Sequence, residues 1–156
     1  MIKAIICFVS ILSFIQPPPV HVKGSGYSGY IFDENYPIWF SIKDQKGRFT
    51  PSKDEIMIAE KLLKKQIKEL NKRRENQIGR CPVIDRNLCK YKRQYVGFLN
   101  TKNEKILWIN FIWHKKAGNQ ISKEVISVYD GCSNYWGIKI NLNTGEVYDL
   151  FINGLA

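Results

Sequence analysis

One helical pattern followed by strand patterns is the feature that most limits the fold of this chain. Between residues 56 and 70, apolar residues recur at steps of three and four, which predicts an amphipathic helix with a single apolar face. Pro51 suits a first helical turn, and Ser52 and Glu55 have the spacing of a capping box, so we expect the helix to begin here and to run to about Arg74. Beyond residue 90 the hydrophobic period changes to two, which is typical of strands.

The strand patterns predict an antiparallel sheet after the helix. Hairpins are expected at 91–98 with 105–113 and at 135–142 with 146–152, with single strands at 37–42 and 124–129. We therefore expect an α+β fold in which one long N-terminal helix packs on a four- or five-stranded antiparallel meander sheet, the cystatin-like arrangement. Both sets of alternate residues in strand 105–113 are largely apolar, so we expect both of its faces to be covered.

The first 24 residues have the pattern of a secretory signal peptide. A basic start at Lys3 is followed by an apolar stretch at 4–15 and by three prolines at 17–19. The apolar stretch is too short for a comfortable transmembrane helix. We expect cleavage near Gly24 or Ser25, export to the periplasm or the extracellular space, and one domain at 25–156 without a membrane span. The alternative is an uncleaved signal anchor.

Export favours disulfides, and the cysteine spacing indicates one. Cys81 and Cys89 flank the segment 82–88 and are the natural pair in an oxidising compartment. Closing so short a loop would contribute roughly 2 to 3 kcal/mol to stability. Cys132 would then be unpaired, and we expect no metal site because His114 is the one histidine that survives removal of the signal.

The positive charge of the chain is concentrated at 61–93. This segment holds twelve Lys and Arg residues and three acids, a net charge of +9 out of +10 for the whole chain. The basic patch expected on and after the helix consists of Lys64, Lys65, Lys68, Lys72, Arg73 and Arg74. It could bind phosphates, anionic lipid or an anionic envelope polymer, and the alternative is a solvated helix face. We do not expect nucleic acid as a partner because export is predicted.

Four aromatic residues at alternating strand positions are candidates for a ligand-binding platform: Tyr91, Tyr95, Trp108 and Trp136. Clustered on the outer face of the sheet, they could bind a carbohydrate or a peptide. The alternative for each of them is packing in the core, which is the usual role of aromatic side chains in strands.

Catalytic patterns are weak in this sequence. His114, Cys132 and Asp130 could form a nucleophilic site, with Cys132 as nucleophile and His114 as base, but their spacing does not require contact. The sequence contains no phosphate-binding loop and no dinucleotide-binding motif. We therefore expect no enzyme, no cofactor and no metal, with a Cys/His hydrolase as the alternative.

Several short motifs resemble a group of small exported bacterial proteins of unassigned activity. They are Phe49-Thr50-Pro51-Ser52 at the start of the helix, Tyr91-Lys92-Arg93-Gln94-Tyr95-Val96-Gly97, and Asp130-Gly131-Cys132-Ser133-Asn134-Tyr135-Trp136. The resemblance implies a cystatin-like fold and supplies no functional residues. The chain departs from the inhibitory cystatins, whose hairpin carries Gln-x-Val-x-Gly, because Gly97 comes one position early and a one-residue change moves side chains to the other face of a strand.

Together these features predict an exported, non-enzymatic binding module whose ligand is a peptide, a protein or an envelope polymer. The alternative is an inhibitor of a protease or toxin that inserts its hairpin loops as a wedge. That alternative requires Gly97 and the turn at 100–103 to project together at one rim.

Overall fold

The predicted helix is present, although shorter than expected, in a computed structural model that describes residues 17–155. Helix α1 spans Lys53–Leu70, and its capping box is confirmed. The backbone N–H of Glu55 donates to Ser52 Oγ, and the N–H of Ser52 donates to a carboxylate oxygen of Glu55. The helix ends before the expected Arg74 because the backbone at Asn71, with φ −88° and ψ 14°, leaves the helical conformation.

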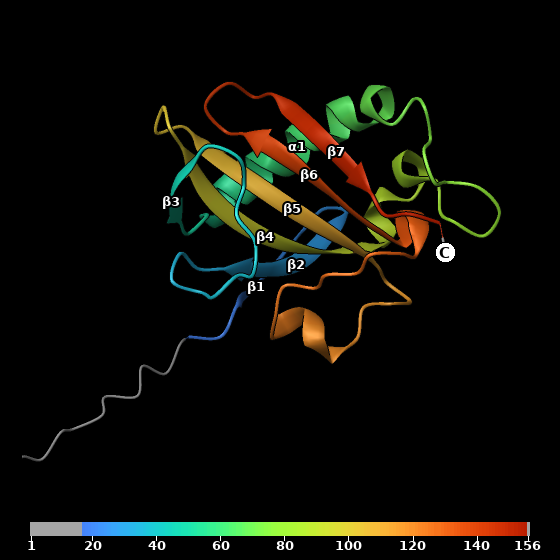
Figure 1. Ribbon diagram of the computed structural model, residues 1–156, viewed down its shortest axis with the longest axis horizontal. Helices are drawn as coiled ribbons and strands as arrows, with labels where there is room; N and C mark the ends of the chain where they lie inside the picture. The colour runs from blue at the N-terminus through green and yellow to red at the C-terminus, as the bar shows by residue number, and fades with distance from the viewer. Residues whose placement is uncertain (1–16, 156) are drawn as a thin grey trace, which may run out of the picture.

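Seven strands form one mixed sheet, and α1 covers one of its faces (Figure 1). The strands are β1 Val20–Gly24, β2 Tyr27–Phe32, β3 Gln45–Phe49, β4 Tyr91–Asn100, β5 Lys105–Trp113, β6 Tyr135–Asn141 and β7 Val147–Ile152. Their order across the sheet is β1-β2-β4-β5-β6-β7, and β3 lies beside β4. Both expected hairpins are confirmed, as β4–β5 and β6–β7. Short 3-10 turns lie at Ile84–Arg86, Leu88–Lys90, Asn119–Ser122 and Cys132–Asn134.

The cystatin-like fold class is wrong, because three strands precede the helix and the sheet is not an antiparallel meander. β4 is ten residues long, and one of its edges accepts two partners. β2 pairs with Arg93–Val96 in parallel, and β3 pairs with Gly97–Asn100 in antiparallel orientation. β1 and β2 form a hairpin that turns at Gly26, whose φ of +83° favours glycine. β1 lies within residues 1–24, which have the pattern of a signal peptide, so the sequence did not predict its pairing with β2.

Two of the expected strands are absent from the described part of the chain. Residues 37–42 and 124–129 have no strand conformation. Side-chain amides replace a strand ladder in the second segment: Gln94 Nε2 donates to the carbonyls of Ile121 and Glu124, and the N–H of Ile126 donates to Gln94 Oε1. The buried side chain of Gln94 thus forms the hydrogen bonds that a neighbouring strand would otherwise supply to this backbone. A pattern of alternating apolar residues cannot distinguish these two arrangements.

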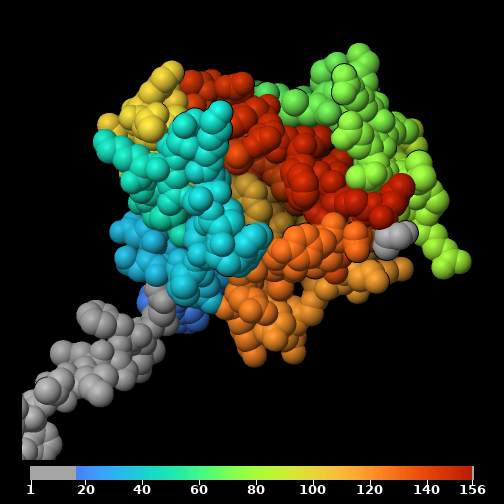
Figure 2. Space-filling model, viewed as in Figure 1, coloured from blue at the N-terminus to red at the C-terminus, as the bar shows by residue number. Residues whose placement is uncertain are grey.

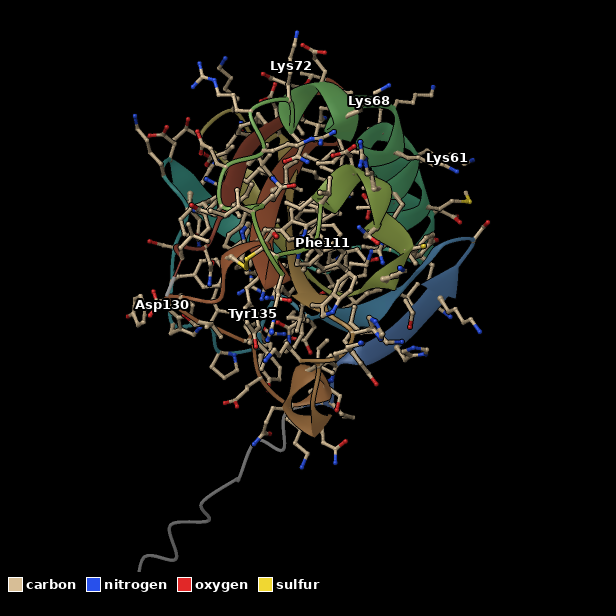
Figure 3. The ribbon with its side chains drawn as sticks, turned by 90° about the vertical axis from the view of Figure 1, so that its right-hand side faces the viewer. Lys61, Lys68, Lys72, Phe111, Asp130 and Tyr135 are labelled. Atoms are coloured by element: carbon tan, nitrogen blue, oxygen red, sulfur yellow. A yellow bond between two sulfur atoms is a disulfide. The ribbon has the colours of Figure 1, made fainter. Side chains whose placement is uncertain are left out.

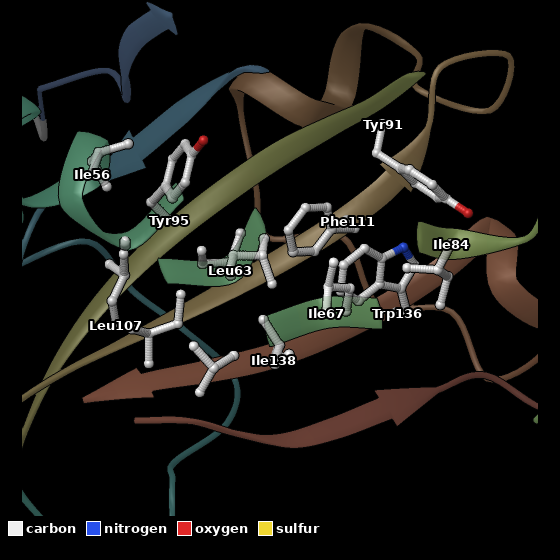
Figure 4. Close-up of a cluster of buried hydrophobic side chains, with 14 of the residues drawn as sticks. Ile56, Leu63, Ile67, Ile84, Tyr91, Tyr95, Leu107, Phe111, Trp136 and Ile138 are labelled. Atoms are coloured by element: carbon white, nitrogen blue, oxygen red, sulfur yellow. The ribbon is translucent and has the colours of Figure 1, made fainter. Parts of the chain in front are cut away.

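Apolar side chains fill both sides of the sheet. Between α1 and the sheet lies the larger cluster, in which Leu63 of the helix joins Leu107 and Phe111 of β5 (Figure 4). On the other face a second cluster includes Phe98 and Ile106. The cyan segment before β3 and the orange segment that leads into β6 lie over this face (Figure 2), and they contribute Ile42 and Val125 to the cluster. The expectation that both faces of the central hairpin are covered is confirmed.

The disulfide joins Cys81 to Cys132, so the expected pairing of Cys81 with Cys89 is wrong. Cys89 is an exposed free thiol. The segment between Cys81 and Cys89 folds into two successive 3-10 turns, at Ile84–Arg86 and Leu88–Lys90, which leave Cys89 at the surface. The bond instead ties the loop after α1 to the turn before β6, across a sequence separation of 51 residues.

β1 lies within the residues assigned to a signal peptide. Its Val22 is buried in the cluster beneath α1, so cleavage near Gly24 or Ser25 would remove one strand of the sheet. Residues 1–16, which carry most of the signal pattern, lie outside the described residues, and the processing site stays a prediction. Within residues 17–155 no helix combines the length and the apolar character needed to cross a membrane.

Candidate functional site

A cavity of about 710 Å³ opens at one end of the sheet, where β1, β2, β4 and β5 meet. Parallel pairing brings the first half of β2 beside the start of β4, and antiparallel pairing brings Trp113 opposite Tyr91. Its lining includes the lysines Lys23, Lys90, Lys92 and Lys115, the histidine His114, and the aromatic residues Tyr27, Tyr91 and Trp113. Gly24, Gly26, Ser28 and Cys89 complete the lining of this site, which we call the basic cavity.

The positive charge of the basic cavity is uncompensated. None of its twelve lining residues is an aspartate or a glutamate. Its four lysines are exposed, and none of them forms an ion pair with any residue in the range 17–155. Like charges around one hollow repel one another, and a bound anion would relieve this repulsion.

Trp113 forms an aromatic wall of the basic cavity, and the core holds it in place. Its ring lies 5.1 Å from that of Tyr91, edge to face, and the ammonium of Lys90 lies 6.0 Å from its centre. Tyr91 is buried, and its hydroxyl donates to the carbonyl of Ser133 at 2.7 Å. Burial raises the pKa of the Tyr91 hydroxyl, which therefore stays a neutral donor. Trp113 is half-buried, so part of its indole is open to a ligand.

The turn between β1 and β2 forms the opposite rim. The ring of Tyr27 lies across Gly24 so closely that a β-carbon at position 24 would come within 2.3 Å of Tyr27 Cζ. Arg93 donates a hydrogen bond to the carbonyl of Gly26 at 3.3 Å. A side chain at position 24 would therefore displace the ring of Tyr27 from this rim, and a buried side chain of β4 anchors the rim.

Arg93 belongs to a buried ionic network that extends from this rim to α1. Its guanidinium donates to the two carboxylate oxygens of Glu60, at 3.0 and 3.3 Å, and to the carbonyl of Tyr91 at 2.6 Å. The hydroxyl of Tyr95 donates to Glu60 at 2.8 Å. Burial raises the pKa of Glu60, and the charge of Arg93 and the hydrogen bond from Tyr95 oppose that rise. The network thus positions the rim and does not itself line the cavity.

The four aromatic residues predicted to bind a ligand do not form one surface. Tyr91, Tyr95 and Trp136 are 1%, 0% and 1% exposed and pack in the core. Trp108 is half-buried on the opposite face, with its ring 4.7 Å from that of Phe40. The predicted platform is therefore wrong, although Tyr91 lines the basic cavity and Trp108 and Trp136 line a separate, smaller hollow.

Trp113 is the binding candidate that the sequence pattern did not single out. A signal for it was present, because Trp113 ends a strand and is followed at once by His114, Lys115 and Lys116. Lys23, on the opposite rim of the basic cavity, lies within the predicted signal peptide, so the sequence did not indicate that it belongs to the same site.

The six cations of the predicted basic patch are all exposed. Figure 3 shows Lys68 and Lys72, with Lys61, along the outer side of α1. Lys72 pairs with Glu69 at 3.2 Å, and the other five form no ion pair within the described chain. Exposure alone fits both a solvated face and a binding face, so the patch stays a prediction.

The alternative catalytic site does not assemble. The sulfur of Cys132 is bonded to Cys81 and cannot act as a thiolate. His114 lines the basic cavity, and Asp130 lies in the exposed segment before β6. Among residues 17–155, no group of three or more His, Cys, Asp or Glu is placed to hold a metal ion.

The inhibitor alternative requires Gly97 at a rim, and the structure places this residue elsewhere. Gly97 lies inside β4, paired with Phe49 of β3 on one side and with Leu107 of β5 on the other. A β-carbon at position 97 would come within 2.3 Å of the Phe49 carbonyl oxygen. Close approach of β3 therefore explains this glycine.

The outer face of the sheet does carry exposed aromatic side chains. Trp39 and Phe151 are 65% and 64% exposed and line a hollow of about 80 Å³. Small-molecule sites usually have volumes of about 300 Å³ or more. The basic cavity is therefore the better candidate for a ligand-binding site.

Comparisons with models of protein families, with curated proteins and with solved structures find no match for this chain. The resemblance to small exported bacterial proteins stays a prediction, and the cystatin-like fold that it implied is wrong.

Proposed function

We propose that the protein is an exported, non-enzymatic binding module that holds an anionic, ring-containing ligand in the basic cavity. The observation that carries this proposal is a set of four lysines without an ion pair in the described chain, placed around a half-buried tryptophan. Among the ligand classes predicted from the sequence, this chemistry favours an anionic envelope polymer, or a fragment of one, over a peptide.

The lysines and the tryptophan would contact different parts of such a ligand. The ammonium groups of Lys23, Lys92 and Lys115 would attract phosphate, sulfate or carboxylate groups, and Lys90 would do so beside the ring of Trp113. The indole face offers a flat apolar surface on which a sugar ring can stack. A volume of about 710 Å³ is in the range of sites that accept a ligand of several hundred daltons.

The disulfide supports the exported location. Bonds such as Cys81–Cys132 form and persist in oxidising compartments and are rare in the cytosol. Polymers that carry phosphate, sulfate or uronate groups on sugar rings belong to the same surroundings. The compartment and the chemistry of the cavity thus point to the same kind of ligand.

The proposal is tested by calorimetry with a sulfated disaccharide and its unsulfated counterpart. We expect the sulfated form to bind and the unsulfated form to bind at least tenfold more weakly, with the difference shrinking as salt is raised to 0.5 M, because salt screens exposed charges. A protein that does not distinguish the two sugars contradicts the proposal.

Matched variants locate the binding to the cavity. Lys92→Ala/Lys115→Ala removes two cavity charges, and Trp113→Ala removes the aromatic wall. We expect each to weaken binding at least tenfold. The control Lys43→Ala/Lys102→Ala removes two exposed charges elsewhere and should leave binding within about twofold. Equal losses in the cavity variants and in the control would place the binding outside the basic cavity.

A further inference from the structure

We infer that the ligand is a linear polyanionic glycan that extends beyond the basic cavity along one flank of α1. This inference rests on the proposed function and adds the length and the path of the ligand.

The two flanks of α1 face different ends of the sheet. On one flank, Gln66 Nε2 donates to the carbonyl of Gly145 in the turn between β6 and β7, at 3.0 Å. On the other flank, Glu60 receives the guanidinium of Arg93 on β4 at 3.0 Å. The helix thus has one side toward the β6–β7 turn and one side toward the strands that form the basic cavity.

The side of α1 that carries Glu60 also carries a row of lysines, because of the helical spacing of these residues. Lys64 follows Glu60 by four residues and Lys68 follows by eight, so both lie on that side, and Lys61 is adjacent to it farther from the sheet. All three are exposed, and none forms an ion pair with a residue of the described chain. We call Lys61, Lys64 and Lys68 the α1 flank. At 1.5 Å per residue it runs for about 10 Å along the helix.

A single side chain connects the α1 flank to the basic cavity. Arg93 donates to Glu60 on α1 and also to the carbonyl of Gly26 at the rim of the cavity, at 3.3 Å. The helix therefore passes close to this rim. Figure 3 shows Lys61 and Lys68 projecting outward from α1 on the side of the molecule where the β1–β2 hairpin also lies. An extended anion in the cavity would meet these lysines next.

The distribution of aromatic rings favours a glycan over single-stranded nucleic acid. Proteins that bind single strands place aromatic side chains along the groove so that successive bases stack on them. On the proposed path the aromatic rings belong to the basic cavity, and the α1 flank consists of three lysines and contributes no ring. A glycan that carries a negative charge on successive units, and that stacks a single sugar ring on Trp113, fits this arrangement.

The length of the ligand is the decisive variable in the test. Binding of a sulfated disaccharide, tetrasaccharide and octasaccharide is measured with the full chain and with Lys64→Gln/Lys68→Gln. We expect the octasaccharide to bind at least tenfold more tightly than the disaccharide. The double variant should lose that gain, about tenfold for the octasaccharide, and should bind the disaccharide as the unaltered protein does. The control Lys43→Gln/Lys102→Gln removes the same charge at exposed positions outside α1 and should keep the gain.

Each outcome separates this inference from the proposed function. If the disaccharide and the octasaccharide bind equally, or if both double variants behave alike, the path along α1 is overturned and the cavity proposal stands. If no sulfated sugar binds, the proposed function itself fails. Tighter binding of a single-stranded oligonucleotide of equal charge, or of vesicles containing phosphatidylglycerol in phosphatidylcholine, would overturn the assignment to a glycan.

Discussion

Arg93 and Glu60 form an ion pair with two hydrogen bonds, at 3.0 and 3.3 Å, and their side chains are only 1% and 7% exposed. The pair joins β4 to α1 inside the apolar layer. Because Tyr95 also donates to Glu60, the carboxylate has several partners in place of water. Buried charges are tolerated when they are paired and hydrogen-bonded in this way, and removal of one partner leaves the other without compensation.

Replacement of Glu60 by Gln should therefore destabilise the protein strongly. The variant leaves the guanidinium of Arg93 buried without a counter-charge, and we expect a loss of about 3 kcal/mol in the free energy of unfolding, measured by urea denaturation. The control is Glu69→Gln, which removes a carboxylate paired with Lys72 at the surface and should cost less than about 0.5 kcal/mol. Similar midpoints for the two variants would contradict the importance of the buried pair.

The capping carboxylate of Glu55 should make stability depend on pH. Burial acts to raise the pKa of Glu55, but hydrogen bonds from Lys105, at 2.7 Å, and from Ser52 outweigh it and hold the pKa below its usual 4.5. A carboxyl whose pKa is lower in the folded state contributes stability that is complete above pH 4.5 and is lost as pH falls through the folded-state value. The difference in unfolding free energy between the unaltered protein and Glu55→Gln should thus shrink below pH 4.5. A constant difference from pH 7 to pH 3 would show that Glu55 makes no such contribution.

Local sequence patterns predicted α1 and the hairpins β4–β5 and β6–β7. They did not predict the pairing of strands that are far apart in the sequence. Ser52 and Glu55 determine the start of α1 through hydrogen bonds between residues three apart in the chain. The two alternating segments at 91–98 and 105–113 are joined by a short turn, so their pairing as a hairpin could also be predicted. The parallel pairing of β2 with β4 joins segments about sixty residues apart, and no local pattern encodes it. The first half of the β1–β2 hairpin was also hidden by its position next to a signal-like stretch.

The residue types that line the basic cavity were expected from the composition, but its location was not. The excess of cations and the number of aromatic rings can be counted in the sequence, and the anionic partner stays a proposal. Which ring is accessible depends on the face that each strand turns to the core, and Tyr95 and Trp136 turn inward whereas Trp113 lies at a strand end. The partner of Cys81 was missed for a similar reason, because proximity in sequence to Cys89 does not bring the two sulfurs together across two tight turns.

The disulfide should be recovered as a linked pair of peptides that contain Cys81 and Cys132. Alkylation without reduction should modify Cys89, which is exposed and free. Replacement of Cys132 by Ser should cost about 4 kcal/mol, because the bond closes a loop of about fifty residues in the unfolded chain. Cys89→Ser serves as the control and should leave the free energy of unfolding unchanged. Recovery of a Cys81–Cys89 peptide, or equal effects of the two variants, would contradict the observed pairing.

We predict that a processed form of the protein begins before Val20. β1 pairs with β2 along its whole length and buries Val22, so a protein that begins at Ser25 lacks an edge strand and one core side chain. We expect a chain beginning at Pro17 to unfold at a higher urea concentration than one beginning at Ser25, since burial of a valine contributes about 1.5 kcal/mol or more. Mass spectrometry of the processed protein gives the N-terminus directly. Processing at Ser25 together with equal stability of the two chains would show that β1 is dispensable.

The amide of Gln94 should hold the segment 121–126 against the sheet. Gln94 is fully buried, and it satisfies the carbonyls of Ile121 and Glu124 and the N–H of Ile126. Gln94→Ala leaves these backbone groups without partners, and we expect a loss of about 1 to 3 kcal/mol. The decisive reading is local: hydrogen exchange at the amide of Ile126 should accelerate far more than exchange at Ile138 of β6, whose hydrogen bonds lie within the sheet. Asn119→Ala, at an exposed position next to the segment, is the control. If exchange at both amides rises together, Gln94 supports the fold as a whole and does not act as a specific clamp on this segment.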